Sequence, residues 1–252
     1  MKFYRALWMI TVVLTVFLPL EASAIGIEGA LGIWNMKQQG DMSYNGPDLN
    51  LEEDLQLGYD TAVFGRIKAD MPLLIPNIYF MFTREKNEGT GTKAEDFVFG
   101  DRTFSKNAPF SSKLELNTYD LALYYGIPFL KTATLGKLNV DAGLNIKLVD
   151  LDVVLTQNNV SESKEYTTPV PMVFLAVQFT PVKRLAIEAE LRAISLGSAD
   201  HYYDLLGRLK YMVIGPAFLC AGYRHEDVKM DRKSLRLNRR AGGPFFEIGV
   251  AF

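Results

Sequence analysis

The stretch KLNVDAGLNIKL, residues 137–148, alternates between apolar and polar residues. Successive side chains of a β-strand point to opposite faces, so every second residue shares a face. A period of two over residues 138–148 therefore predicts a strand with one apolar and one polar face, rather than a helix. The apolar face would carry Leu138, Val140, Ala142, Leu144, Ile146 and Leu148.

The same alternation recurs along the chain and predicts ten strands. Their connections mostly alternate between long polar loops and short turns, which is typical of an outer-membrane barrel with long outer loops and short periplasmic turns. The expected long loops are residues 39–54, 87–112, 157–167 and 230–243. The expected strands are residues 26–38, 55–71, 76–86, 113–127, 137–156, 168–181, 184–196, 201–213, 216–228 and 244–252.

These segments favour an all-β fold, a transmembrane antiparallel up-and-down barrel of ten strands. Several run to 11 residues or more, the length that a tilted membrane crossing needs, whereas the strands of a soluble β-sandwich average about 5–6 residues. Eight or twelve strands are the alternatives, depending on how residues 87–112 are divided. Aromatic residues would form two girdles, with Tyr119, Tyr203 and Tyr223 in the outer one and Phe179 and Tyr211 in the periplasmic one.

The N-terminal residues have the composition of a secretory signal peptide. Lys2 and Arg5 precede an apolar run at residues 7–20, and Ala22 and Ala24 mark the expected cleavage point. That run is shorter than the roughly 20 apolar residues of a helical membrane span. Residues 1–24 are therefore expected to be removed, and residues 25–252 to form the barrel as one domain.

Composition excludes several classes of protein. The formal net charge of −2 gives no strong field toward nucleic acid. Cys220 is the only cysteine, so no intrachain disulfide is expected. Gly-rich phosphate loops and the cysteine or histidine spacings of zinc sites are absent from the sequence, which predicts neither a cofactor nor a metal.

The polar strand faces would line a charged lumen. A short turn and same-face pairing place Arg192 beside Asp204 and Glu188 beside Arg208, with paired residue numbers that sum to 396. In the next strand pair, 201–213 with 216–228, the residue numbers of paired positions would sum to 428. This register places Asp204 beside Arg224. The resulting cluster is a selectivity constriction or ligand site on one interpretation. The balanced charges favour the other, a salt-bridge plug that fills a narrow barrel.

Two histidines are the candidates for a catalytic or metal site at the outer rim. His201 and His225 lie near the outer ends of adjacent predicted strands, with Asp200, Glu226 and Asp227 beside them in sequence. His225 shares the apolar face of Tyr223, however, and no serine stands at a spacing that suggests a nucleophile. The sequence also departs from the omptin proteases, because we expect no Asp-x-Asp or Asp-x-His pair at a strand end, and from the lipid A deacylases, whose histidine is followed closely by serine. No catalytic residue is therefore predicted.

The C-terminal sequence EIGVAF, together with the signal peptide and the alternating strands, resembles Gram-negative outer-membrane β-barrel proteins. GALGIW and MPLLIPNIYF resemble, more narrowly, a group of uncharacterised proteobacterial outer-membrane barrels. The resemblance implies location in the outer membrane and recognition by the barrel-assembly machinery. The residues that match the terminal assembly signal are Phe246, Ile248, Val250 and Phe252.

We expect a monomeric barrel with a charged, mostly filled lumen and a structural or surface-interaction role. A narrow channel or small-solute transporter is the alternative, and an enzyme with a rim site is a weaker one. The expected partners are outer-membrane lipid and lipopolysaccharide. The basic run RKSLRLNRR, residues 232–240, would face lipopolysaccharide phosphates from the last outer loop, because arginine binds phosphate well.

Overall fold

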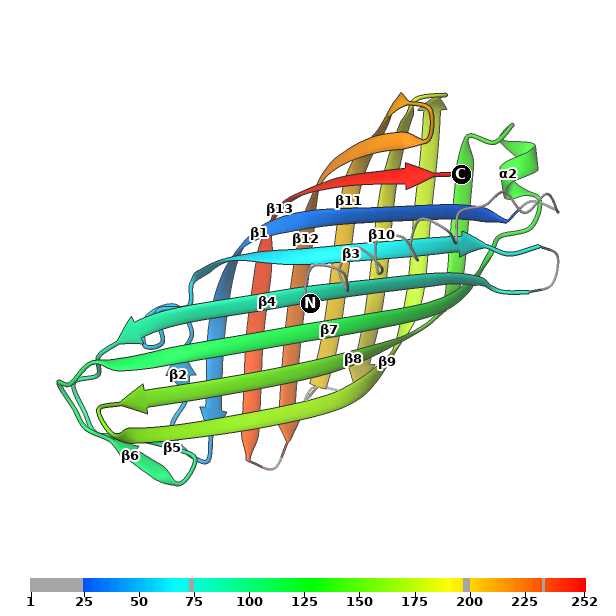
Figure 1. The fold of residues 1–252 in the computed structure, drawn as a ribbon. Helices are drawn as coiled ribbons and strands as arrows, with labels where there is room; N and C mark the ends of the chain where they lie inside the picture. The colour runs from blue at the N-terminus through cyan, green and yellow to red at the C-terminus, as the bar shows by residue number, and fades with distance from the viewer. Residues whose placement is uncertain (1–24, 73–74, 197–199, 233) are drawn as a thin grey trace, which may run out of the picture.

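The structure is a computed structural model, and it describes residues 25–72, 75–196, 200–232 and 234–252. The predicted signal peptide, including Ala22 and Ala24, lies outside the described residues. Ten long antiparallel strands form one sheet, and β1 (blue in Figure 1) pairs with β13 (red) to close it. The predicted all-β barrel and its ten strands are confirmed. The barrel strands are β1 (Gly26–Tyr44), β3 (Tyr59–Asp70), β4 (Asn77–Gly91), β7 (Phe110–Gly126), β8 (Leu138–Gln157), β9 (Val160–Val182), β10 (Leu185–Leu196), β11 (Asp200–Ile214), β12 (Ala217–Arg232) and β13 (Leu235–Ala251).

Four short elements complete the fold. Strand β2 (Leu49–Asn50) pairs with β1, and β5 (Phe97–Phe99) pairs with β6 (Arg102–Phe104) in a separate hairpin. These three lie at one end of the barrel, which we call the outer end, and α2 (Leu130–Ala133) lies at the opposite, inner end (Figure 1). No helix in the described part of the chain is long and apolar enough to cross a membrane.

The middle of the barrel is apolar outside and polar inside. Leu144 and Ile146 of β8 keep 71% and 55% of their surface exposed, whereas Asn145 between them and Lys147 after them are buried in the lumen. The C-terminal strand follows the same rule: Phe246 and Ile248 face outward and pair with Ile33 and Leu31 of β1. Tyr119, Tyr203 and Tyr223 also face outward. An exposed apolar belt around a polar interior is the reverse of a soluble protein and suits a barrel surrounded by lipid.

Toward the outer end, this arrangement inverts within single strands. In β8 the outward residues change from Leu148 to Asp150, and the inward residues change from Lys147 to Val149 and Leu151, which are buried. In β7 the inward residue Asp120 likewise gives way to buried Leu114 and Leu116. The outer ends therefore have a polar surface and an apolar interior, as expected of a β-sheet protein in water.

The prediction of long loops at residues 157–167 and 230–243 is wrong, because the strands continue through both stretches. β8 and β9 meet at a tight hairpin in which Gln157 pairs with Val160, and Arg232 of β12 pairs with Leu235 of β13. The polar residues of these stretches occupy the outward face of strands that extend into water. Their alternating apolar partners, such as Leu235 and Leu237, are buried.

The two remaining long connections fold into the outer end of the barrel. Residues 45–58 bury Leu49, Leu51, Leu55 and Leu57 completely. Their backbone is held by lumenal side chains: the Gln38 amide donates to the Leu57 carbonyl at 2.6 Å, and the Ser112 hydroxyl donates to that of Leu55 at 2.5 Å. Gln157 of β8 similarly donates to the carbonyls of Ser105 and Ala108, both at 3.0 Å.

Candidate functional site

The lumen at mid-barrel holds the charged cluster that the sequence suggested. β10 and β11 pair as expected, with Arg192 opposite Asp204 and Glu188 opposite Arg208. Arg208 Nε lies 3.5 Å from Glu188 Oε2, and Arg192 Nη1 lies 3.9 Å from Asp204 Oδ2. Arg224 completes the set from β12, donating to both carboxylate oxygens of Asp204 at 3.0 and 2.9 Å.

The register expected between β11 and β12 is wrong by two residues. Asp204 stands opposite Glu226, and Arg224 stands opposite Leu206, so the Asp204–Arg224 contact is diagonal. An irregularity between Met212 and Ile214 moves the register beside the turn. A shift of two residues keeps each side chain on its face, which is why Arg224 still points into the lumen.

Asp204 is the centre of an outer charge layer, which we define as Lys147, Arg192, Asp204, Arg224 and Glu226. Lys147 Nζ lies 3.0 Å from Asp204 Oδ2, and Arg224 also donates to Glu226 at 2.6 Å. All five side chains are within 1% of complete burial. Three cations thus surround Asp204, and two of them, Lys147 and Arg192, also lie 3.0 and 3.7 Å from Asp120.

An inner charge layer lies nearer the inner end and is centred on Arg208. Its guanidinium lies 2.5 Å from Glu190 and 3.2 Å from Glu247. Arg66 also donates to Glu247, at 3.0 Å, and reaches Glu28 at 2.5 Å. The two layers join through Glu190, which accepts a hydrogen bond from Arg192 at 3.0 Å.

Among the described residues, these layers and their neighbours contain eight cationic and eight anionic side chains. Aromatic rings fill space between them: the Arg224 guanidinium lies 4.6 Å from the Trp34 ring, and that of Arg192 lies 4.8 Å from the Tyr79 ring. The charges are therefore compensated and mostly buried, which is the arrangement of a plug. The charged residues are Arg66, Lys68, Lys147, Arg192, Arg208, Lys210, Arg224, Arg239, Glu28, Glu85, Asp120, Glu188, Glu190, Asp204, Glu226 and Glu247.

Sequence reasoning missed most of this network. Strand parity does place Lys147, Glu190 and Glu247 on the polar faces that line the lumen, and the structure buries them there, but the predicted cluster did not include them. Their partners could not be found this way. Arg66 and Glu247 are 181 residues apart in sequence, and they meet because the closed sheet brings β3 and β13 to either side of β1.

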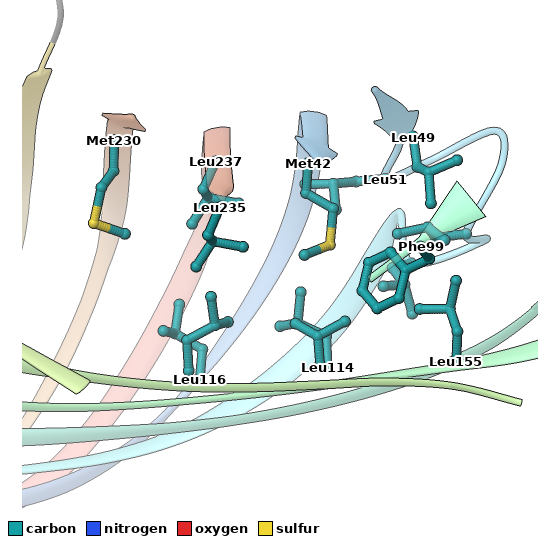
Figure 2. Packing of buried hydrophobic residues seen from close by; sticks show 14 of the residues in the cluster. Met42, Leu49, Leu51, Phe99, Leu114, Leu116, Leu155, Met230, Leu235 and Leu237 are labelled. Atoms are coloured by element: carbon teal, nitrogen blue, oxygen red, sulfur yellow. The ribbon is translucent and has the colours of Figure 1, made fainter. Parts of the chain in front are cut away.

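The outer end of the lumen contains an apolar core instead of charge. Figure 2 shows two facing layers, with Met230, Leu237 and Met42 opposite Leu116 and Leu114. The charged plug is therefore covered on its outer side by a second, water-excluding barrier. A cavity of about 50 Å³ remains beside this core, lined by Val149, Val170, Ile194, Tyr202 and Met230 among others.

The histidines lie on the outward faces of β11 and β12, and His201 also lines the 50 Å³ cavity. His201 Nε2 lies 3.1 Å from Asp227 Oδ1, and the other oxygen of Asp227 lies 3.3 Å from Arg240 Nε. His225 shares the outward face of Tyr223, as expected. At the start of β11, a hydrogen bond from the Arg232 side chain, with one from the Asp231 backbone N–H, lowers the pKa of Asp200. No group of three or more His, Cys, Asp or Glu suited to a metal ion occurs in the described ranges.

One expectation about acidic pairs is wrong. Asp150 and Asp152 form an Asp-x-Asp pair in β8, near its outer end. Both carboxylates face outward, because Leu151 between them is buried in the apolar core. Asp150 accepts a hydrogen bond from Thr167 at 2.7 Å on the exposed surface. The pair does not face a cavity in which a substrate could be enclosed.

The basic run also differs from its expected position. It belongs to the end of β12 and to β13 rather than to a loop. Arg239 points inward to Glu85 and Glu226, while Arg236 pairs with Asp48 on the surface at 3.0 Å. Four arginines of the run, including Arg232 and Arg240, are thus paired with carboxylates of this chain.

Comparison with known proteins shows the fold. No protein-family model and no curated protein sequence matches the chain. Among solved structures it is similar to the outer membrane protease OmpT from Escherichia coli, with a TM-score of 0.56, 9% identity and coverage of 92% of this chain and 99% of that one. The chain therefore has the fold of an outer-membrane β-barrel.

Two other likenesses have lower scores. The translocator domain of the autotransporter NalP from Neisseria meningitidis gives a TM-score of 0.43 at 10% identity, covering 95% of this chain and 92% of that one. Ail, the attachment invasion locus protein of Yersinia pestis, gives 0.40 at 10% identity, covering 89% and 98%. Neither identifies a narrower family, so the resemblance to one proteobacterial group stays a prediction.

Proposed function

We propose that this chain is a closed outer-membrane barrel with a structural or surface-interaction role. One observation carries the proposal: the lumen is filled by a compensated charge network and then by an apolar core, so no continuous aqueous path is favoured. The exposed apolar belt supports its insertion into lipid. Contact with lipopolysaccharide, and recognition of Phe246, Ile248, Val250 and Phe252 by the assembly machinery, belong to the same proposal.

A narrow channel and a rim enzyme are weaker candidates. Ion passage would require the pairs around Arg208 and Asp204 to separate, and each separation would leave a buried charge uncompensated. An enzyme would use His201 with Asp227, yet this pair faces outward and Arg240 occupies the second carboxylate oxygen. No described cavity adjoins both residues of this pair.

We expect purified wild-type protein in planar bilayers to show no steady conductance steps. Arg208→Ala removes a lumenal charge and should allow at most brief openings, while Arg184→Ala removes an exposed charge from the β9–β10 turn and should behave as wild type. Heat-dependent migration in detergent gels would show that each variant is folded. Steady wild-type openings whose size changes in Arg208→Ala but not in Arg184→Ala would overturn the closed-barrel proposal.

A further inference from the structure

The wall of the barrel is incomplete between β9 and β10. Their pairing ends at Val173 opposite Ala193, and among the described residues Val160–Met172 pairs with β8 alone. Pro169 and Pro171 occupy the strand just beyond this point. Proline lacks an amide N–H and is found in sheets at edge positions, so the sequence itself favours an unpaired edge here. Beyond the last pair, toward the outer end at the lower left of Figure 1, β9 bends away from β10.

A groove of about 1100 Å³ lies on the outward face at this seam. It crosses the strands along one row of paired residues, from Leu123 to Leu144, Val173, Ala193 and Tyr203. Its lining is almost entirely apolar and continuous with the exposed belt of the barrel. The groove volume is slightly above the range of sites that enclose small ligands, about 300–1,000 Å³.

The groove also reaches side chains that belong to the interior. Met172 and Ile194 point inward, yet both line the groove because they lie beyond the last β9–β10 pair. Ile194 at the same time lines the 50 Å³ cavity beside the apolar core. Ile194 thus lies between the lipid-facing groove and this cavity.

We propose that this groove is a binding site for an acyl chain of an outer-leaflet lipid. The proposal rests on the proposed function, since it requires the apolar belt to lie in the membrane. An acyl chain fits because it is elongated, has no polar group to satisfy along the row of apolar residues, and is supplied by the lipid that the groove adjoins. A protein strand fits poorly, because Pro169 and Pro171 offer no amide hydrogens for pairing.

Photolabelling tests this site. Protein would be reconstituted in vesicles of phosphatidylethanolamine and phosphatidylglycerol containing a trace of phosphatidylethanolamine with a photoactivatable acyl chain. It would then be extracted in mild detergent, washed and irradiated, so that only retained lipid labels the chain. We expect labelling of Leu144, Val173 and Ala193 to exceed that of Leu31 and Val63, which are exposed on β1 and β3 of the opposite wall, by about tenfold.

Matched variants test whether the groove is the cause of the excess labelling. Ala193→Trp fills the groove and should reduce labelling to the level of the opposite wall. Ala189→Trp, on the same strand and face but outside the groove, should leave it unchanged. Leu144→Trp provides a second filling variant at a position that is 71% exposed, so it tests the site even if Ala193→Trp fails to fold.

Two outcomes would overturn the proposal: equal labelling of both walls, or full labelling in the filled variants. These results are separable from the closed-barrel proposal. A barrel that conducts ions can still retain lipid at this seam, and a closed barrel can fail to do so.

Discussion

Replacing Asp204 by alanine should lower the free energy of unfolding by about 3–5 kcal/mol. Asp204 is fully buried and is contacted by Arg224, Lys147 and Arg192. Without its carboxylate these three buried cations would share fewer anions. Breaking a buried ion pair from one side is costly because the remaining charge keeps its desolvation penalty.

Urea unfolding of the barrel in lipid vesicles, followed by gel mobility, would measure this loss. Asp152→Ala is the matched control, since Asp152 faces outward on β8 and stands between Glu115 and Glu165. Its removal relieves like charges and should change stability by less than about 0.5 kcal/mol. Equal effects of the two substitutions would show that the network around Asp204 does not stabilise the barrel.

Replacing Phe104 by alanine should detach the β5–β6 hairpin from the outer end. Phe104 is completely buried and stacks on Phe97 with ring centroids 5.1 Å apart. Truncating a buried phenylalanine costs about 3–5 kcal/mol, and the loss of this ring removes the contacts of Phe104 with both Phe97 and Phe110. Its local opening should become at least about a hundredfold more frequent, whereas the belt strands should remain folded.

Limited proteolysis of the reconstituted protein would detect this opening as faster cleavage within residues 92–109. Val98→Ala is the control, because Val98 lies on the same hairpin but leaves 38% of its surface exposed. Unchanged cleavage in Phe104→Ala would mean that the contacts of Gln157 with Ser105 and Ala108 hold the hairpin without its aromatic core.

The fold could be predicted from sequence because alternation is a local property. Residues 138–148 show it without reference to any other strand, and the same pattern repeated often enough to give the strand number. Strand ends were less accurate, since polar stretches such as 157–167 were interpreted as loops. A strand that leaves lipid becomes polar outside, and polarity alone does not distinguish it from a loop.

The site was predicted only where two strands are joined by a short turn. The Arg192–Asp204 pairing followed from such a turn, but a local irregularity near Met212 shifted the next register by two residues. The apolar core at the outer end was missed, although its signal is present in the sequence. Between Leu148 and Val149 the apolar face of β8 changes from even to odd residues, and the prediction treated the strand as having one face throughout.

This change of face also fixes the bilayer thickness that the barrel prefers. Leu148 and Asp150 are consecutive residues on the outward face of β8. The boundary between hydrocarbon and water therefore lies between these two side chains. A bilayer thicker than the apolar belt would bring Asp150 and its neighbours toward hydrocarbon and would have to thin locally or tilt the barrel. The chain should therefore sort toward membranes whose hydrophobic thickness matches the distance from this boundary to the inner end.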